Sequence, residues 1–339
     1  MTEKAPNASS SDSRINPELK TQTYLRGDDP YEREMLERFG KAYTEYRDTI
    51  KKVNQGVELD YPIHLQIENV YACNLKCGHC ARNYTLQPDH KFMSDALFKK
   101  IIDEAVQIGS KSLDMTTWGE AFLDKNVFDK ITYARDKGII DIRIHSNGIL
   151  VNREVAEKIV KCGVTWINIS LDAATAEVYA KVRGGDYDKA ASAVGHILNA
   201  RFKYDTFIPK LRVSFVKQKL NEHESDKFRQ RFQGIAEIAI QQFRDRMGNI
   251  KGDYHSSEEL TDVDPMTLAL SCAQPFERVY IRYNGNVNPC CNDLENTLTY
   301  DNLEKNSLYD IYNNQKAKKL KAEIKGKKFN DFCHTCLTK

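Results

Sequence analysis

Between residues 62 and about 245 the sequence alternates strand-like and helix-like segments, and no other feature constrains the fold as strongly. Six strands are expected, at 63–69, 111–116, 141–146, 165–171, 210–217 and 237–243. Helical patterns lie between them, at 94–108, 124–137, 152–162, 175–203 with a break at Gly184-Gly185, and 221–234. Six β/α units in series predict a parallel sheet. The alternation alone leaves open whether the sheet curves into a barrel or lies flat and doubly wound.

The expected strands each have one apolar and one polar face. In the first strand Ile63, Leu65 and Ile67 share the apolar face. The polar faces of the first four strands carry His64, Gln66 and Glu68; Ser112, Asp114 and Thr116; Arg143, His145 and Asn147; and Asn168, Ser170 and Asp172. An antiparallel sheet with one solvated face alternates in the same way, but the intervening helices argue against it. We therefore predict an α/β fold, a partial (β/α)6 TIM-like barrel with a polar interior.

Other segments complete the expected domain organisation. Residues 1–28 are polar and predict a disordered tail, and 29–60 predict an N-terminal helix with one apolar stripe. The barrel is expected over 61–247 and a polar linker over 248–270. Residues 271–339 predict a small α+β module with a hairpin turning at Asn284-Gly285.

Composition excludes several classes of function. The formal net charge is only +2, which gives no electrostatic footprint for nucleic acid or an anionic membrane. The N-terminus lacks a signal-peptide core, and no apolar run is long enough to span a bilayer. We expect a cytoplasmic protein with neither a nucleic-acid nor a membrane partner.

Nine cysteines in such a chain point to metal or redox chemistry, because disulfides are disfavoured in the cytoplasm. Seven of them form two groups: Cys73, Cys77 and Cys80, and then Cys272, Cys290, Cys333 and Cys336. Cys162 is expected to be a small buried residue. The distribution predicts two metal centres.

The first group, spaced C-x3-C-x2-C, supplies three thiolates. A zinc site would need a fourth ligand, which His79, His90 or a distant cysteine could supply. A four-iron cluster can instead use three thiolates and leave one iron open for a chelating molecule. The group follows the first strand directly, at the rim where barrel active sites lie.

This motif in a six-unit β/α domain resembles the radical S-adenosylmethionine superfamily. The resemblance implies a [4Fe-4S] cluster whose open iron chelates S-adenosylmethionine, which is cleaved to a 5′-deoxyadenosyl radical. Gly119 and Glu120 match the family's GGE-like turn, Asn147 lies in the TNG-like "HSNG", and "ISLDAAT" matches its SLD. The cofactor contacts implied are therefore His79, Gly119, Glu120, Asn147, Ser170, Asp172 and Arg183. Trp118 and His79 depart from the family pattern.

The C-terminal cysteines resemble a shortened SPASM, or twitch, domain. The resemblance implies one auxiliary [4Fe-4S] cluster held by Cys272, Cys290, Cys333 and Cys336. Four thiolates also suit a zinc ribbon, which stays open as an alternative.

Polar residues of the inner face are the candidates for catalysis. His145 leads for proton transfer because it lies at a strand's C-terminal end, and Asp114 and Glu68 are expected to line the substrate pocket. Cys291 is a candidate hydrogen donor in an epimerisation. By resemblance we expect oxidation or epimerisation of a small hydroxylated substrate, a sugar or aminocyclitol, with an external flavodoxin- or ferredoxin-type electron donor. The alternatives are a peptide-modifying radical enzyme and, from another class, a non-catalytic zinc-binding module.

Overall fold

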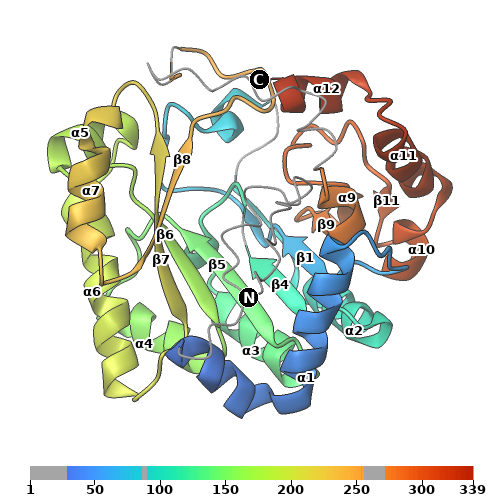
Figure 1. Cartoon of the computed structure of the whole chain (residues 1–339), viewed down its shortest axis with the longest axis horizontal. Coiled ribbons are helices and arrows are strands. Elements are labelled where there is room, and N and C mark those ends of the chain that lie inside the picture. Colours follow the sequence, from blue (N-terminus) through green and yellow to red (C-terminus); the bar gives the residue numbers. More distant parts are fainter. Residues whose placement is uncertain (1–28, 86–89, 116, 253, 256–271, 339) are drawn as a thin grey trace, which may run out of the picture.

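A single nine-stranded sheet runs through the computed structural model, in the order β11-β10-β9-β1-β4-β5-β6-β7-β8 (Figure 1). The structure describes residues 29–85, 90–115, 117–252, 254–255 and 272–338. The predicted tail at 1–28 and most of the predicted linker at 248–270 therefore lie outside the described residues. No described helix is long and apolar enough to cross a membrane.

All six predicted strands are present and pair in parallel, which confirms the partial barrel. They are β1 (His64–Ile67), β4 (Ser112–Met115), β5 (Asp141–Ser146), β6 (Trp166–Ser170), β7 (Lys210–Lys217) and β8 (Glu237–Gln242). The remaining strands are β2 (Val70–Tyr71) and β3 (Lys91–Phe92), which form a separate pair, and β9 (Arg278–Ile281), β10 (Asn286–Asn288) and β11 (Asp301–Asn302).

Helices follow the strands as the alternation predicted. They are α1 (Pro30–Asn54), α2 (Asp95–Ile108), α3 (Val127–Lys137), α4 (Arg153–Cys162), α5 (Ala176–Val182), α6 (Tyr187–Lys203), α7 (Ser225–Phe232), α9 (Gln274–Glu277), α10 (Leu308–Tyr312), α11 (Gln315–Lys325) and α12 (Asp331–Thr338). Short 3-10 turns are η1 (Ala81–Tyr84), η2 (Ala121–Leu123) and η3 (Glu222–Glu224). The break expected at Gly184-Gly185 separates α5 from α6.

The apolar strand faces form the core with the helices. Leu65, Leu113, Ile142 and Ile167 are fully buried in one cluster that also includes Ile131 of α3. The opposite, polar faces therefore line the inside of the sheet's curve, as the pattern predicted.

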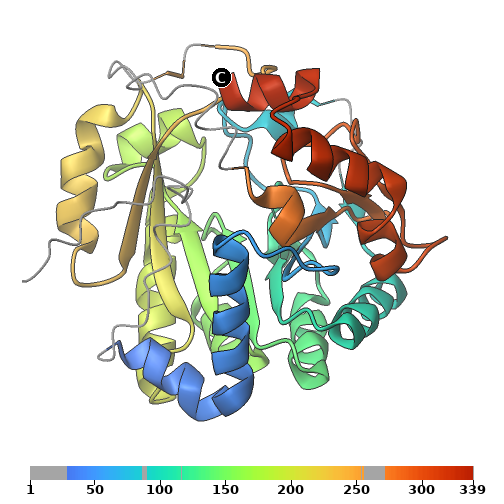
Figure 2. The same ribbon diagram turned by 45° about the vertical axis from the view of Figure 1, so that its right-hand side comes forward.

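Helix α1 covers the N-terminal ends of the strands. Its residues Met35 and Tyr43 pack with Ile63, Ile140 and Ile208, which come just before β1, β5 and β7. Figures 1 and 2 place α12 and the loop around η1 together at the opposite end of the molecule from α1. The loops that follow the strands, including both cysteine-bearing segments, thus gather at one end.

The C-terminal module continues the barrel's own sheet instead of forming a separate one. Strand β9 pairs in parallel with β1, with Gln66 opposite Tyr280, and β10 returns antiparallel to β9. The predicted turn is present, and Gly285 has the positive φ of 85° that glycine tolerates best.

A buried carboxylate fastens this junction. Glu68 is fully buried, and its oxygens accept hydrogen bonds from the Tyr280 hydroxyl and from Arg282 Nε, both at 2.7 Å. The Arg282 side chain is 1% exposed, so the ion pair is almost entirely removed from water. The barrel and the C-terminal module are thus joined by an ion pair to which each contributes one residue.

Replacing Arg282 by Met should lower the free energy of unfolding by about 3–5 kcal/mol, because it leaves the Glu68 charge buried and unpaired. Denaturant unfolding of the anaerobically purified protein measures this loss. Lys181→Ala, which breaks the exposed pair with Glu177, is the control and should change stability little. Equal losses in the two variants would contradict the assigned role of the buried pair.

Candidate active site and metal centres

The three thiols of the first group converge in the loop after β2. Burial raises the pKa of all three, that of Cys77 to about 11. Each pKa is raised further by a second thiol of the group: Cys77 acts on Cys73, Cys80 on Cys77, and Cys73 on Cys80. The raised pKa values keep the thiols neutral, whereas a bound metal centre would deprotonate them and offset their mutual repulsion with its positive charge. The residues therefore fit a bound cluster.

The turn after β4 is shaped by close backbone contact with the cysteine loop. A Cβ on Gly119 would lie 2.1 Å from the carbonyl oxygen of Val70, so no side chain fits there. The next amide, Glu120 N, donates to the carbonyl of Ala72 at 2.8 Å. Glycine is thus required where the turn passes beside Cys73.

Glu120 links this turn to the end of β5. Its carboxylate accepts hydrogen bonds from Ser146 Oγ and Asn147 N, both at 2.8 Å, and burial raises its pKa to about 7. Asn147 Nδ2 lies 2.7 Å from Asn74 Oδ1 and 3.7 Å from Cys73 Sγ. The structure therefore brings Gly119, Glu120 and Asn147 together beside Cys73.

A second group of predicted cofactor residues surrounds Cys77. Asp172 accepts hydrogen bonds from Arg183 Nε at 2.8 Å and lies 3.4 Å from His79 Nε2. Burial opposes ionisation of Asp172, but the charge of Arg183 and the hydrogen bonds from His79 and the Val216 amide together lower the carboxyl pKa. The Arg183 carbonyl lies 3.7 Å from Cys77 Sγ. Ser170 is not part of this group, because its hydroxyl faces Asn168 Nδ2 at 3.2 Å.

Gln218 belongs with this group, and sequence reasoning missed it. Its side chain is fully buried after β7, and Nε2 lies 3.3 Å from His79 Nδ1. Its position just after a strand's C-terminal end was the signal that could have found it. His79 is therefore held from both ring nitrogens.

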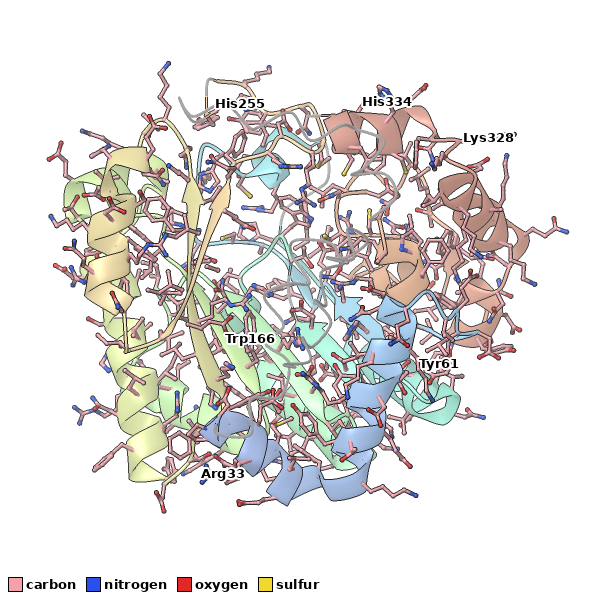
Figure 3. The ribbon with its side chains drawn as sticks, viewed as in Figure 1. Arg33, Tyr61, Trp166, His255, Lys328 and His334 are labelled. Atoms are coloured by element: carbon pink, nitrogen blue, oxygen red, sulfur yellow. The ribbon has the colours of Figure 1, made fainter. Side chains whose placement is uncertain are left out.

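The structure places the three inner-face residues predicted for catalysis in two different settings. His145 Nε2 lies 3.4 Å from Asp114 Oδ2, and the His145 ring contacts Trp166, the first residue of β6, edge-on. Figure 3 labels Trp166 near the centre of the view. Glu68 was predicted to line the substrate pocket, but its carboxylate accepts buried hydrogen bonds from Tyr280 and Arg282. It is not free to exchange protons with a substrate in this arrangement.

The C-terminal thiols also act on one another. Burial raises the pKa of Cys272 to about 11 and of Cys333 to about 12, and the charge of Cys336 raises both further. Burial, then Cys291 and Cys272, raise the pKa of Cys290. These four thiols fit a second, fully ligated centre by the same argument as the first. No three His, Cys, Asp or Glu side chains in the described ranges are close enough to hold a single metal ion.

Cys291 directly follows Cys290 of the second group and contacts the turn beside the first. Its carbonyl accepts a 2.7 Å hydrogen bond from Trp118 Nε1, which belongs to the turn that also carries Gly119. Its charge also acts on Tyr280 on the inner face. The departure from the family pattern at Trp118 therefore connects the first centre to the C-terminal module.

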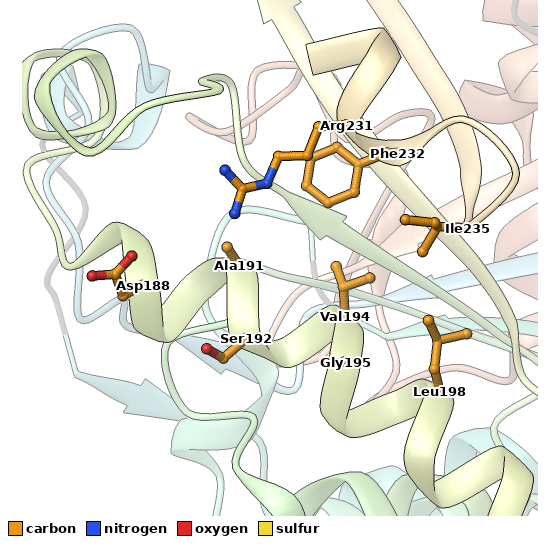
Figure 4. Close-up of a pocket in the computed structure, with 9 residues that line it drawn as sticks. All are labelled: Asp188, Ala191, Ser192, Val194, Gly195, Leu198, Arg231, Phe232 and Ile235. Atoms are coloured by element: carbon orange, nitrogen blue, oxygen red, sulfur yellow. The ribbon is translucent and has the colours of Figure 1, made fainter. Parts of the chain in front are cut away.

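A pocket elsewhere on the molecule is separate from these groups. It lies between α6 and the end of α7 (Figure 4), and its lining includes Asp188, Ser192, Leu198, Arg231 and Ile235. No predicted site residue lines it.

Two family models match the chain, and they coincide with the two thiol groups. Residues 69–211 match the radical SAM superfamily, and residues 272–337 match an iron–sulfur cluster-binding domain, SPASM. The chain belongs to the radical SAM superfamily and is a radical SAM enzyme with a SPASM domain. Its cofactors are a [4Fe-4S] cluster with S-adenosylmethionine and auxiliary iron–sulfur ligation in the SPASM domain. These iron–sulfur centres replace the zinc sites that the sequence had left open as alternatives.

Known relatives are similar over part of their length. The mycofactocin maturase MftC of Mycolicibacterium smegmatis is 32% identical over 171 residues, which are 50% of this chain and 41% of MftC. A probable GTP 3′,8-cyclase of Methanococcus vannielii is 30% identical over 36% of this chain and 40% of its own. The chain thus spans less than half the length of these relatives. Streptococcus suis SuiB, solved with precursor peptide SuiA, shares the fold with a TM-score of 0.62 at 16% identity, over 79% of this chain and 68% of SuiB.

Gly119→Ala should lower the rate of S-adenosylmethionine cleavage by about a hundredfold, because the added methyl group displaces the turn beside Cys73. The rate of 5′-deoxyadenosine formation under dithionite measures the effect, and iron content confirms that the clusters are loaded. Gly195→Ala in α6 is the matched control, since its Cβ meets nothing within 4 Å. Cleavage at the wild-type rate in Gly119→Ala would refute the role of the turn.

Proposed function

We propose that this chain is a peptide-modifying radical enzyme. The observation that carries the proposal is the 32% identity to a maturase over half of this chain. The shared fold with a protein solved on its precursor peptide is compatible with it. When bound, the cluster and S-adenosylmethionine supply a 5′-deoxyadenosyl radical that takes a hydrogen atom from the substrate.

In this proposal the chain's residues divide into holding and proton-transfer roles. Cys73, Cys77 and Cys80 hold the cluster, and the residues grouped beside them, Gly119, Glu120, Asn147, His79, Asp172 and Arg183, hold S-adenosylmethionine. His145, oriented by Asp114 at 3.4 Å, accepts the proton that leaves the substrate.

The C-terminal thiols have an electron-transfer role in the same proposal. Cys272, Cys290, Cys333 and Cys336 hold one auxiliary [4Fe-4S] cluster. Held by four thiolates, such a cluster would have no open iron for substrate and would supply an acceptor for the electron left by a two-electron oxidation. An external flavodoxin- or ferredoxin-type protein reduces the first cluster.

A small hydroxylated molecule is the second candidate substrate, with oxidation or epimerisation as the reaction. The inner face favours it, because polar groups from several strands face inward there, as a hydroxyl-rich molecule requires. The similarity to a probable GTP 3′,8-cyclase also supports a small-molecule substrate. In an epimerisation Cys291 would return the hydrogen atom to the substrate carbon.

Mass spectrometry of candidate substrates incubated with the reduced enzyme decides between these functions. Loss of two hydrogens from a peptide encoded near the gene supports the maturase, and the same loss from an aminocyclitol or sugar supports the second candidate. Unchanged mass with one deuterium taken up from heavy water identifies epimerisation, and Cys291→Ala should then stop turnover. Modification of sugars with every candidate peptide left unchanged would refute the peptide proposal.

Removing single thiols should separate the two centres. Cys73→Ala should abolish 5′-deoxyadenosine formation, because the first cluster loses one of its three ligands. Cys333→Ala should keep this reaction but stop substrate oxidation, with iron falling from about eight to about four per chain. Iron analysis and quantification of 5′-deoxyadenosine check both. Retained cleavage in Cys73→Ala would overturn the assignment of the first centre.

A further inference from the structure

Buried oxygens without hydrogen-bond partners face the interior of the barrel. They are Gln66 Oε1, Asp114 Oδ1 and Asn168 Oδ1, and none has a partner within the described part of the chain. Gln66 is 8% exposed and Asn168 is 4% exposed. Arg212 Nε, opposite Asn168 in the register, is a buried donor without a partner on the same face. Native proteins pair nearly all such groups, so the three oxygens indicate a ligand that supplies donors to them.

These side chains form one row across four neighbouring strands. Gln66 of β1 stands opposite Asp114 of β4 in the parallel register. Asp114 Oδ2 reaches His145 of β5 at 3.4 Å, and His145 stands opposite Asn168 of β6. The three unpartnered oxygens therefore border a continuous strip of the inner face.

One carboxylate oxygen of Asp114 is left without a partner in this strip. Arg143 stands opposite Asp114 in the register, but its guanidinium turns to Asp141, with Nη2 at 2.7 Å from Oδ2. The only ion-pair partner that Asp114 has among the described residues is His145, at the long distance of 3.4 Å. The strip thus has a carboxylate at its centre, while the guanidinium groups of Arg143 and Arg212 lie over the neighbouring Trp166 ring.

Solvent, and hence a ligand, reaches the strip beside His145. The His145 side chain is 42% exposed and that of Asp114 is 16% exposed, although both belong to the inward face. The amides of Gln66 and Asn168 lie on either side of this opening and can present their oxygens to it.

We propose that this row is a substrate subsite for an ammonium group. An ammonium carries three donors and one positive charge, which match the oxygens of Gln66, Asp114 and Asn168, whereas a hydroxyl offers one donor and no charge. The inference rests on the proposed function, in that the same interior receives the substrate. The ammonium belongs to a lysine side chain in a peptide or to the amino group of an amino sugar, since both carry the same chemistry.

Titration calorimetry on the anaerobic, cluster-loaded enzyme with S-adenosylmethionine tests the subsite without turnover. The probes are the blocked tripeptide Gly-Lys-Gly against Gly-norleucine-Gly, and glucosamine against glucose. At least one amine probe should bind about tenfold or more tightly than its neutral match. Preference for the lysine peptide alone assigns the subsite to a peptide, and preference for glucosamine alone assigns it to an amino sugar. Equal affinity within both pairs would overturn the proposal.

Substitutions at Gln66 locate the binding to this row. Gln66→Lys places a tethered ammonium beside Asp114 and should abolish the preference for the amine probe, whereas Gln66→Glu should strengthen it severalfold. Gln233→Lys makes the same change at an exposed position outside the barrel and should leave the preference intact. A preference that survives Gln66→Lys would place the amine elsewhere and refute the subsite. The wild-type probe comparison stands even where a variant fails to fold.

Failure of the proposed function gives a different result. An enzyme that forms no 5′-deoxyadenosine with dithionite would refute the radical chemistry, while the calorimetric preference for amines would still be measured. Normal 5′-deoxyadenosine formation with no amine preference refutes the subsite alone.

Discussion

The buried pair between Glu68 and Arg282 is the contact on which the arrangement of the two halves depends. Glu68 ends the first barrel strand and is fully buried, so its carboxylate is tolerated only with partners. Those partners, Tyr280 and Arg282, come from the segment that begins the C-terminal hairpin. Because the charge of Glu68 must be neutralised, β9 aligns with β1. This alignment also places the auxiliary thiols at the end of the barrel that carries the first thiol group.

The polar side chains inside the barrel are paired to different degrees along the strands, from the end covered by α1 to the C-terminal strand ends. Near α1, Asp141 is saturated by Arg143 and by the Tyr46 hydroxyl at 2.7 Å, so this layer closes the sheet. Midway, Asp114 and His145 remain partly free, which leaves room for substrate chemistry. At the strand ends Glu120 and Asp172 are again fully engaged and hold the cysteine loop in place. The partly free groups thus lie between two layers of fully engaged carboxylates.

Strand pattern and cysteine spacing predicted most of the fold and the membership of both thiol groups. The six strands, the break before Tyr187 and the glycine turn at Gly119 all follow from local chemistry: alternation, helix termination and close backbone approach. The contacts of Glu68 could not be predicted, because a polar residue on an inward face looks the same in sequence whether it meets a substrate or an arginine. Gln218 was missed because its partner, His79, lies 139 residues away.

The sequence by itself determined that the chain builds a parallel α/β sheet with a polar interior and carries three plus four clustered thiols, because periodicity and spacing are local properties. Only the tertiary structure decided that the C-terminal hairpin joins the barrel's sheet, that Glu68 is structural while Asp114 stays available, and that Gln66, Asp114 and Asn168 form one row. Those outcomes depend on which residues from distant parts of the sequence come into contact. Burial then requires each charge and each hydrogen-bonding atom to be paired within the protein or by a ligand.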